Sequence, residues 1–340
     1  MTKLYVGIDV AKGKFDVSYT VDGQNFFGYS TFTNDKKGIK KFFKQAENFM
    51  QKYKQEEIHF CMEATGIYHF ELCEYLQNSA HIVSVVNPLK TKSFSKSLML
   101  RTKNDKVDSS MLSLYAFLHN PPHTPKLPES IRKFRSLVRY KETLLESRTQ
   151  EIARLKSSLD ADVKQLINNK IRFIEKQTAE TIFKIQNLIK EDKFLSTQMK
   201  LLKTVDCVGD KVAWVMLAEF KFEDIESISP KAMVAHAGLS PREHSSGSSV
   251  KGREHISRMG NSTLRKILFL PALGCIKNPN YFTGFYLNLI EKGKPKKVAV
   301  TAVMRKILLT SMGVLKNQQP FDPNWAKKTQ TKYLENLNVA

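Results

Sequence analysis

A short apolar segment near the start of the chain, Tyr5–Lys12, carries a single acidic residue, Asp9. Burying a carboxylate in an apolar strand is costly unless a metal ion, a cation or hydrogen bonds compensate its charge. A tight turn at 12–14 and a second strand pattern at 15–20 follow, so we predict a β-hairpin. Two interpretations of Asp9 stay open at this point: it caps the hairpin turn, or it is the first residue of a catalytic site.

Strand patterns and helical patterns alternate through the rest of the first 120 residues. The strand patterns are 26–32, 58–62 and 81–86, and the helical patterns are 68–77 and a helix that Asn34 or Asp35 caps and that runs to Lys54. This alternation predicts an α/β sheet domain over residues 1–120.

Three further acidic residues accompany these elements. Glu63 ends a strand pattern, and open α/β sheets bind their ligands at the carboxyl ends of strands. Asp105 and Asp108 open a predicted helix that runs to Leu118 with Asn104 as its cap, and their spacing of three places them on one face. Taken alone, acids in a first helical turn are explained by the helix dipole.

Together with Asp9, these acids form a set of four carboxylates that can converge on one site. Hard oxygen ligands in this number suit two Mg²⁺ ions, with Mn²⁺ as the alternative, bridging a scissile phosphate. The pattern therefore favours phosphoryl transfer.

The charge of the chain points to a polyanionic partner. Among 340 residues, 54 Lys and Arg stand against 33 Asp and Glu, which gives a net charge of +21. Lys and Arg that neutralise phosphates gain free energy from counterion release, so nucleic acid is the partner that we expect. A basic surface without a specific partner is the alternative interpretation.

The cysteines and the hydropathy pattern bear on the compartment. The four cysteines stand in apolar contexts without metal-ligand spacing, and we expect reduced core residues: Cys61, Cys73, Cys207 and Cys275. The apolar stretches look too short for a membrane span, and the N-terminus lacks a signal-peptide core. We therefore expect a cytoplasmic protein without a membrane partner.

A proline-rich stretch at 120–128 marks a predicted domain boundary. Residues 121–200 then comprise this linker and a segment that lacks proline and glycine from 129 to 199, whose apolar spacing predicts long paired helices or a coiled coil. A mostly helical domain is expected over 201–323, followed by a polar tail, 324–340. The fold class that we predict is α/β plus all-α.

The least periodic part of the second half is 235–261, where serines, glycines and cations lie together between apolar helices. We interpret it as a functional loop, and a disordered Ser/Gly linker is the alternative. The cations that we expect to contact nucleic acid are Lys12, Lys103, Arg242, Lys251, Arg253, Arg258, Arg265, Lys294, Lys296 and Lys297.

Taken together, these motifs resemble those of the DEDD-type insertion-sequence transposases, the serine recombinases guided by a bridge RNA. The motifs that carry the resemblance are GIDVAK at 7–12, MEATG at 62–66, KNDKVD at 103–108, AGLSP at 237–241, SG at 246–247, ISRMGN at 256–261 with LR at 264–265, and GKPKK at 293–297. The resemblance extends from Leu4 to about Pro323.

The resemblance implies a ribonuclease H-like, RuvC-like fold for the first domain, with the four acids as a metal-binding tetrad. It further implies that Ser246, in a C-terminal transposase domain, is the nucleophile that forms a phosphoserine link with DNA; Ser245 adjoins it and stays an alternative. Expected partners are donor and target DNA, a structured guide RNA and further copies of the chain, from dimer to tetramer, with the tetrad and the serine from different subunits. The family usually has glycine where Cys207 stands, which puts a helix-hairpin-helix turn there in doubt.

Three other functions stay open. A Holliday-junction-type resolvase would use the same acids with a metal-activated water. An actin- or hexokinase-like phosphotransferase would begin with a similar hairpin, but the second glycine-rich phosphate loop that it needs is missing from the sequence. An RNA-binding scaffold with a decayed nuclease domain would not need all four acids.

Overall fold

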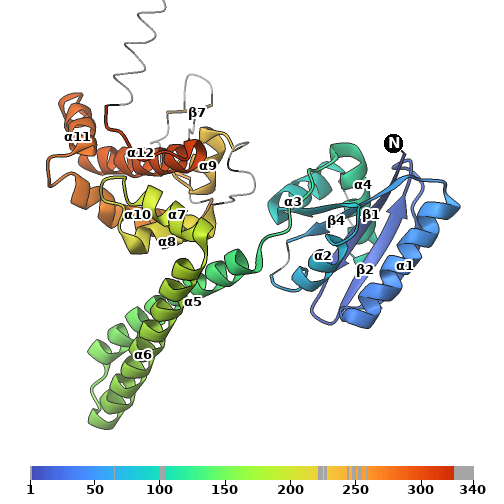
Figure 1. Ribbon diagram of the computed structural model, residues 1–340, viewed down its shortest axis with the longest axis horizontal. Helices are drawn as coiled ribbons and strands as arrows, with labels where there is room; N and C mark the ends of the chain where they lie inside the picture. The colour runs from blue at the N-terminus through green and yellow to red at the C-terminus, as the bar shows by residue number, and fades with distance from the viewer. Residues whose placement is uncertain are drawn as a thin grey trace, which may run out of the picture. The chain divides into compact units, whose positions relative to one another are not determined.

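The computed structural model describes residues 2–64, 66–99, 104–220, 225, 228–242, 245–246, 250–251, 255–257 and 259–324, with the backbone alone at 242, 245–246, 250–251 and 255 (Figure 1). The chain divides into two compact units, Met1–Lys126 and Leu127–Ala340. The division falls inside the proline-rich stretch 120–128.

The first unit is built on a mixed five-stranded sheet in the order β3-β2-β1-β4-β5. Its strands are β1 (Lys3–Val10), β2 (Lys14–Thr20), β3 (Phe27–Thr33), β4 (Glu57–Glu63) and β5 (Ile82–Val86). Strands β1, β2 and β3 pair antiparallel, whereas β1, β4 and β5 pair parallel. The predicted hairpin is confirmed, and the sheet is compatible with a ribonuclease H-like domain.

Among the described residues of this unit, four helices accompany the sheet: α1 (Lys36–Lys52), α2 (Phe70–Leu76), α3 (Pro88–Ser97) and α4 (Asp105–His119). Three of them match predicted helices. Helix α3 was not predicted, because its Lys- and Ser-rich sequence lacks a clear apolar period. It starts instead on local signals, since the Asn87 side chain accepts a hydrogen bond from the Leu89 amide and Pro88 occupies the first turn.

Alternation along the strands separates the sheet into two faces. On one face Ile8, Val17 and Phe60 are fully buried, and helix α1 contributes Ile39 and Phe42 to the same core. This apolar face supplies the hydrophobic stabilisation of the unit.

The opposite face carries small and polar residues, and helix α4 packs on it. A Cβ atom at Gly7 of β1 would overlap the backbone of Ser109 and Ser113 in α4, so the helix crosses the strand at the closest approach that glycine allows. Next to it, the hydroxyls of Ser18 and Ser109 are hydrogen-bonded at 2.8 Å inside the protein. The sequence therefore positions α4 over the carboxyl end of β1.

The second unit is mostly helical. Its helices are α5 (Glu129–Ser157), α6 (Ala161–Glu191), α7 (Lys193–Leu202), α8 (Asp210–Glu219), α9 (Pro230–His236), α10 (Ser262–Cys275), α11 (Tyr281–Glu291) and α12 (Lys296–Asn317). Helices α5 and α6 lie side by side as a long hairpin, in agreement with predicted paired helices, while a coiled coil stays a prediction (Figure 1). Helices α8, α10 and α12 contribute to one apolar core that also includes residues of α5.

One sequence expectation about membrane spans is corrected. Within the described part of the chain, helix α12 is the single helix long and apolar enough to cross a membrane by length and composition. Many of its apolar residues lie in the core instead: Val303, Ile307 and Leu308 are fully buried against the other helices. Its hydropathy is that of a core helix.

The expectation of four reduced cysteines is wrong for two of them. Cys207 and Cys275, which are 68 residues apart, form a disulfide, whereas Cys61 and Cys73 are free and buried. The bond forms because the turn before α8 packs against the end of α10, and spacing along the chain gives no sign of this contact. Cys207 also has φ 66°, a left-handed conformation that favours glycine.

Candidate active site

Two acids stand at the carboxyl ends of neighbouring parallel strands. The register of β1 and β4 pairs Ile8 with Met62, so Asp9 and Glu63 follow at adjacent positions of the sheet. Both side chains belong to the face that α4 covers, because they are in phase with Gly7 and Cys61. The fold thus places the first two predicted acids at one edge.

The other two acids come from the first turn of α4. Asn104 caps this helix, since its Oδ1 atom accepts a hydrogen bond from the Val107 amide at 2.8 Å. Asp105 is exposed and Asp108 is half-buried. Because α4 packs directly on β1, its N-terminus lies near the end of that strand.

The other acids act electrostatically on Asp9. Partial burial, and then the charges of Asp108, Asp105, Asp16 and Glu63 in decreasing order, together raise the pKa of Asp9 to about 6. Repulsion of this kind is what a bound cation relieves.

A fifth acid, Asp16, was not predicted. It lies directly opposite Asp9 in the β1–β2 pair and is almost fully buried. Burial raises its pKa, but hydrogen bonds from Thr31 at 2.5 Å and Tyr29 at 2.9 Å, together with Lys14, hold the pKa below its usual value. The sequence does contain a signal for this residue: Asp16, like Asp9, is a carboxylate within an apolar strand of the same hairpin.

Lys14 connects this acid to the predicted tetrad. Its Nζ atom lies 3.1 Å from Asp16 Oδ2 and 2.5 Å from Asp105 Oδ2. An ammonium group of the chain itself therefore neutralises part of the acidic cluster. Lys12, the predicted phosphate contact of the same turn, is exposed.

Glu63 is oriented by a residue of the unpredicted helix α3. Thr91 is buried, and its hydroxyl donates a hydrogen bond to Glu63 Oε2 at 2.9 Å. The same hydroxyl lies 3.0 Å from the Pro88 carbonyl, which fixes its rotamer.

The donor chemistry fits a divalent cation. Among the described residues, no group of three or more His, Cys, Asp or Glu side chains is arranged so that it could hold a metal ion by itself. Mg²⁺ does not require one, because it is bound through one or two carboxylates together with substrate phosphates and water. Asp9, with its raised pKa, and Glu63, with its fixed carboxylate, are the residues best placed to hold it.

The segment with the predicted nucleophile is folded into two short strand pairs. β6 (Pro241–Arg242) pairs with β9 (His255–Ile256), and within them β7 (Ser245–Ser246) pairs with β8 (Val250–Lys251). Ser246 lies opposite Val250 in the inner pair, but the side chains of both serines are outside the described part. The choice between Ser246 and Ser245 stays a prediction.

The other predicted cations, apart from Lys12, divide into three groups. Lys294, Lys296 and Lys297 are exposed around the start of α12. Arg265 is half-buried, and a Cβ atom on Gly238 would overlap its guanidinium group, so it packs against the turn at Gly238. The remaining calls lie outside the described residues or side chains: Lys103, Arg242, Lys251, Arg253 and Arg258.

Comparisons with known proteins agree across both units. Residues 6–162 match the transposase family DEDD_Tnp_IS110, and residues 199–287 match the family described as "Transposase IS116/IS110/IS902 family". The pilin gene-inverting proteins of Moraxella bovis and Moraxella lacunata are each 32% identical to the chain over 330 residues, which cover 95% of the chain and 98% of the relative. The similarity is therefore to whole proteins and not to one domain.

Proposed function

Because the chain belongs to the IS110 family of transposases, and so acts on DNA, we propose that it cuts and rejoins DNA strands through a phosphoserine intermediate. The observation that carries this proposal is the combination of an acidic cluster around Asp9 with the Ser246 segment in one chain. Relatives named for inverting a pilin gene support recombination of DNA.

In the proposed reaction, the Ser246 hydroxyl attacks the scissile phosphorus. The new Ser–O–P bond replaces the bond to the 3′ oxygen, and the hydroxyl proton passes to that oxygen. Attack by the 3′ hydroxyl of another strand reverses the step and releases the serine. The phosphoserine conserves the bond energy, so strands rejoin without an external energy source.

The acids give this reaction its electrostatic support. Mg²⁺, or Mn²⁺, would polarise the phosphate and stabilise the departing oxygen when bound at this site. Asp9, Glu63, Asp105 and Asp108 are the residues that would hold it. Thr91 keeps Glu63 oriented. Lys14 neutralises part of the negative charge of Asp16 and Asp105.

The partners that we propose are donor and target DNA and a structured guide RNA, with assembly as a dimer or tetramer in the cytoplasm. A net charge of +21 supports polyanion binding. With sequence choice left to RNA pairing, the protein would contact backbone and shape. Sequencing of the RNA that co-purifies with the protein, and pairing of that RNA with flanking DNA, tests this part.

Serine replacement tests the covalent step. Ser246→Ala should abolish covalent protein–DNA adducts on a denaturing gel while DNA affinity stays within about twofold. Ser245→Ala is the matched control and should retain the adduct. Cleavage without adduct in the wild type would identify the resolvase mechanism with metal-activated water. Full activity of Asp9→Asn would show that the reaction does not require the acidic cluster. RNA binding by the wild type without any cleavage of DNA would identify a scaffold.

A further inference from the structure

The two ends of the segment that carries Ser246 meet at one place. The Asn261 amide donates a hydrogen bond to the His236 carbonyl at 2.6 Å, and the Ser257 amide donates to the Ser240 carbonyl at 2.9 Å. Gly260, at φ 120°, lies so close to 235–238 that a Cβ atom would overlap this backbone. The two ends of the segment therefore lie together, and we define these ends, 236–240, 257 and 259–261, as the base.

Asn261 makes three different bonds at this base. Its backbone amide makes the bond to His236 described above. Its Oδ1 atom accepts a hydrogen bond from the Leu264 amide at 3.0 Å and so caps helix α10. Its Nδ2 atom donates to Glu219 Oε2 at 2.8 Å. One side chain thus joins the base, the start of α10 and the end of α8.

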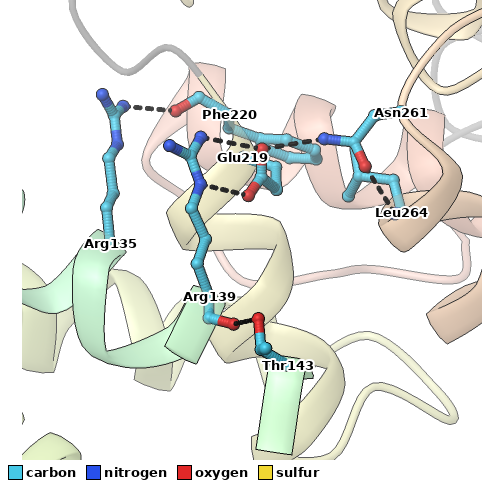
Figure 2. A network of polar contacts seen from close by, with 7 residues as sticks. All are labelled: Arg135, Arg139, Thr143, Glu219, Phe220, Asn261 and Leu264. Carbon is cyan, nitrogen blue, oxygen red and sulfur yellow. Dashed lines mark hydrogen bonds and ion pairs between the residues drawn. The ribbon is translucent and has the colours of Figure 1, made fainter. Parts of the chain in front are cut away.

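Glu219 continues the connection to the long helix α5. Both of its carboxylate oxygens accept hydrogen bonds from Arg139, at 2.8 Å from Nε and 3.1 Å from Nη2 (Figure 2). The Glu219 side chain is only 10% exposed, and its hydrogen bond raises the pKa of Arg139. A bidentate pair of this kind fixes orientation as well as distance.

A second arginine, one turn earlier on α5, supports the same contact. Arg135 Nη2 donates to the Phe220 carbonyl at 2.7 Å, directly after the end of α8 (Figure 2). Two arginines of α5 therefore hold the end of α8, where Glu219 binds Asn261. Because α5 pairs with α6, these polar contacts connect the helical hairpin to the base.

We infer that Arg139, Glu219 and Asn261 form a positioning relay through which α5 fixes the base of the Ser246 segment. The inference rests on the proposed function, because it gives Ser246 the role of nucleophile. Arg139 and Glu219 do not touch the reacting atoms in this scheme. They determine the position of the base, and the base in turn determines the position from which the serine approaches DNA.

The test compares variants of the full chain. Arg139→Met removes the guanidinium group that pairs with Glu219 and leaves Asn261 intact. Asn261→Asp retains the helix cap, since Asp and Asn cap equally well, but replaces the donor to Glu219 with a second carboxylate. Arg148→Met is the control, because Arg148 is on the same helix and pairs with Glu175 of α6 at 2.7 Å, away from the base.

Two readouts are measured on each variant: hydrogen exchange of backbone amides at the base, and the rate of adduct formation at saturating DNA. Arg139→Met and Asn261→Asp should each exchange about tenfold faster at the base. Their adduct rates should fall about tenfold with DNA affinity unchanged within twofold, and Arg148→Met should match the wild type.

The outcomes separate this inference from the proposed function. Wild-type exchange at the base in Arg139→Met overturns the relay, whatever the adduct rate. An equal effect of Arg148→Met also overturns it, because the loss then belongs to α5 in general. A wild-type protein that forms no adduct contradicts the proposed function, while the exchange rates still decide whether the relay holds the base.

Discussion

Lys14 and Asp105 form an ion pair of 2.5 Å between the first hairpin and the first turn of α4. The same ammonium group lies 3.1 Å from Asp16, so it neutralises two acids that belong to different elements. Hydrogen bonds raise the pKa of Lys14 above its ordinary value; the bond to Asp105 has the largest effect and the bond to Asp16 the next largest. An internal cation therefore occupies part of the acidic cluster that would attract a metal ion.

Replacing this cation should strengthen metal binding. Lys14→Met removes a positive charge beside Asp105 and Asp16, so we expect the affinity for Ca²⁺, an inert substitute for Mg²⁺, to rise several-fold in calorimetric titration. The melting temperature without metal should fall, and added Ca²⁺ should restore it. Lys12→Met, at an exposed position of the same turn, is the control. Weaker Ca²⁺ binding by Lys14→Met would show that Lys14 supports the ion instead of competing with it.

The raised pKa of Asp9 predicts a stability that depends on pH. The folded protein holds the Asp9 proton up to about pH 6, whereas the unfolded chain releases it near pH 4. Between these values the folded state binds more protons, so this residue makes stability fall as pH rises. Asp9→Asn removes the effect and should melt several degrees higher than the wild type at about pH 7.5 in chelator.

The same comparison at about pH 4.5 provides the control, because the protonated wild type should then melt close to Asp9→Asn. Divalent cations at neutral pH should stabilise the wild type more than the variant. A melting difference that is equal at both pH values would contradict the electrostatic account of Asp9.

The contact between Thr91 and Glu63 predicts a residue that acts by orienting an acid. Thr91→Val keeps the side-chain shape but removes the hydroxyl 2.9 Å from Glu63. We expect metal-dependent strand cleavage to fall about tenfold with little change in DNA affinity. Thr91→Ser restores the hydroxyl and should recover most of the activity. Equal loss in both variants would indicate that packing of the methyl group matters, and not the hydrogen bond.

Local patterns were sufficient to predict most of the fold. Asp9 and Glu63 could be placed at strand ends because period-2 burial and turn residues define strands within a few residues. Asn104 predicted the first residue of α4 correctly, because capping depends on residues that are neighbours in the sequence. These signals are local, and the structure agrees with them.

The contacts that complete the cluster are not local. Asp16 contributes because the register of the hairpin sets it opposite Asp9. Lys14 contributes because Asp105 of α4, 91 residues later in the chain, lies beside it in the fold. Thr91 was missed together with its helix, and the pairing of Cys207 with Cys275 depends on how α8 and α10 pack. Each of these relations requires the tertiary structure, which composition and spacing do not specify.

The close packing of α4 on β1 yields a prediction about geometry. Gly7→Ala places a methyl group against the backbone of Ser109 and Ser113, which cannot move independently of the helix. Overpacking at such a site costs roughly 1–3 kcal/mol or more. The displaced helix should also carry Asp105 and Asp108 away from Asp9, so Ca²⁺ affinity should fall together with the free energy of unfolding measured in urea.

Gly13→Ala is the matched control, because a Cβ atom at Gly13 meets no atom within 4 Å. It lies in the same hairpin and should change neither stability nor Ca²⁺ affinity appreciably. If Gly7→Ala lowers stability but leaves Ca²⁺ affinity at the wild-type value, the acids of α4 do not share an ion with Asp9. Metal binding would then depend on the strand acids, Asp9 and Glu63, without the helix.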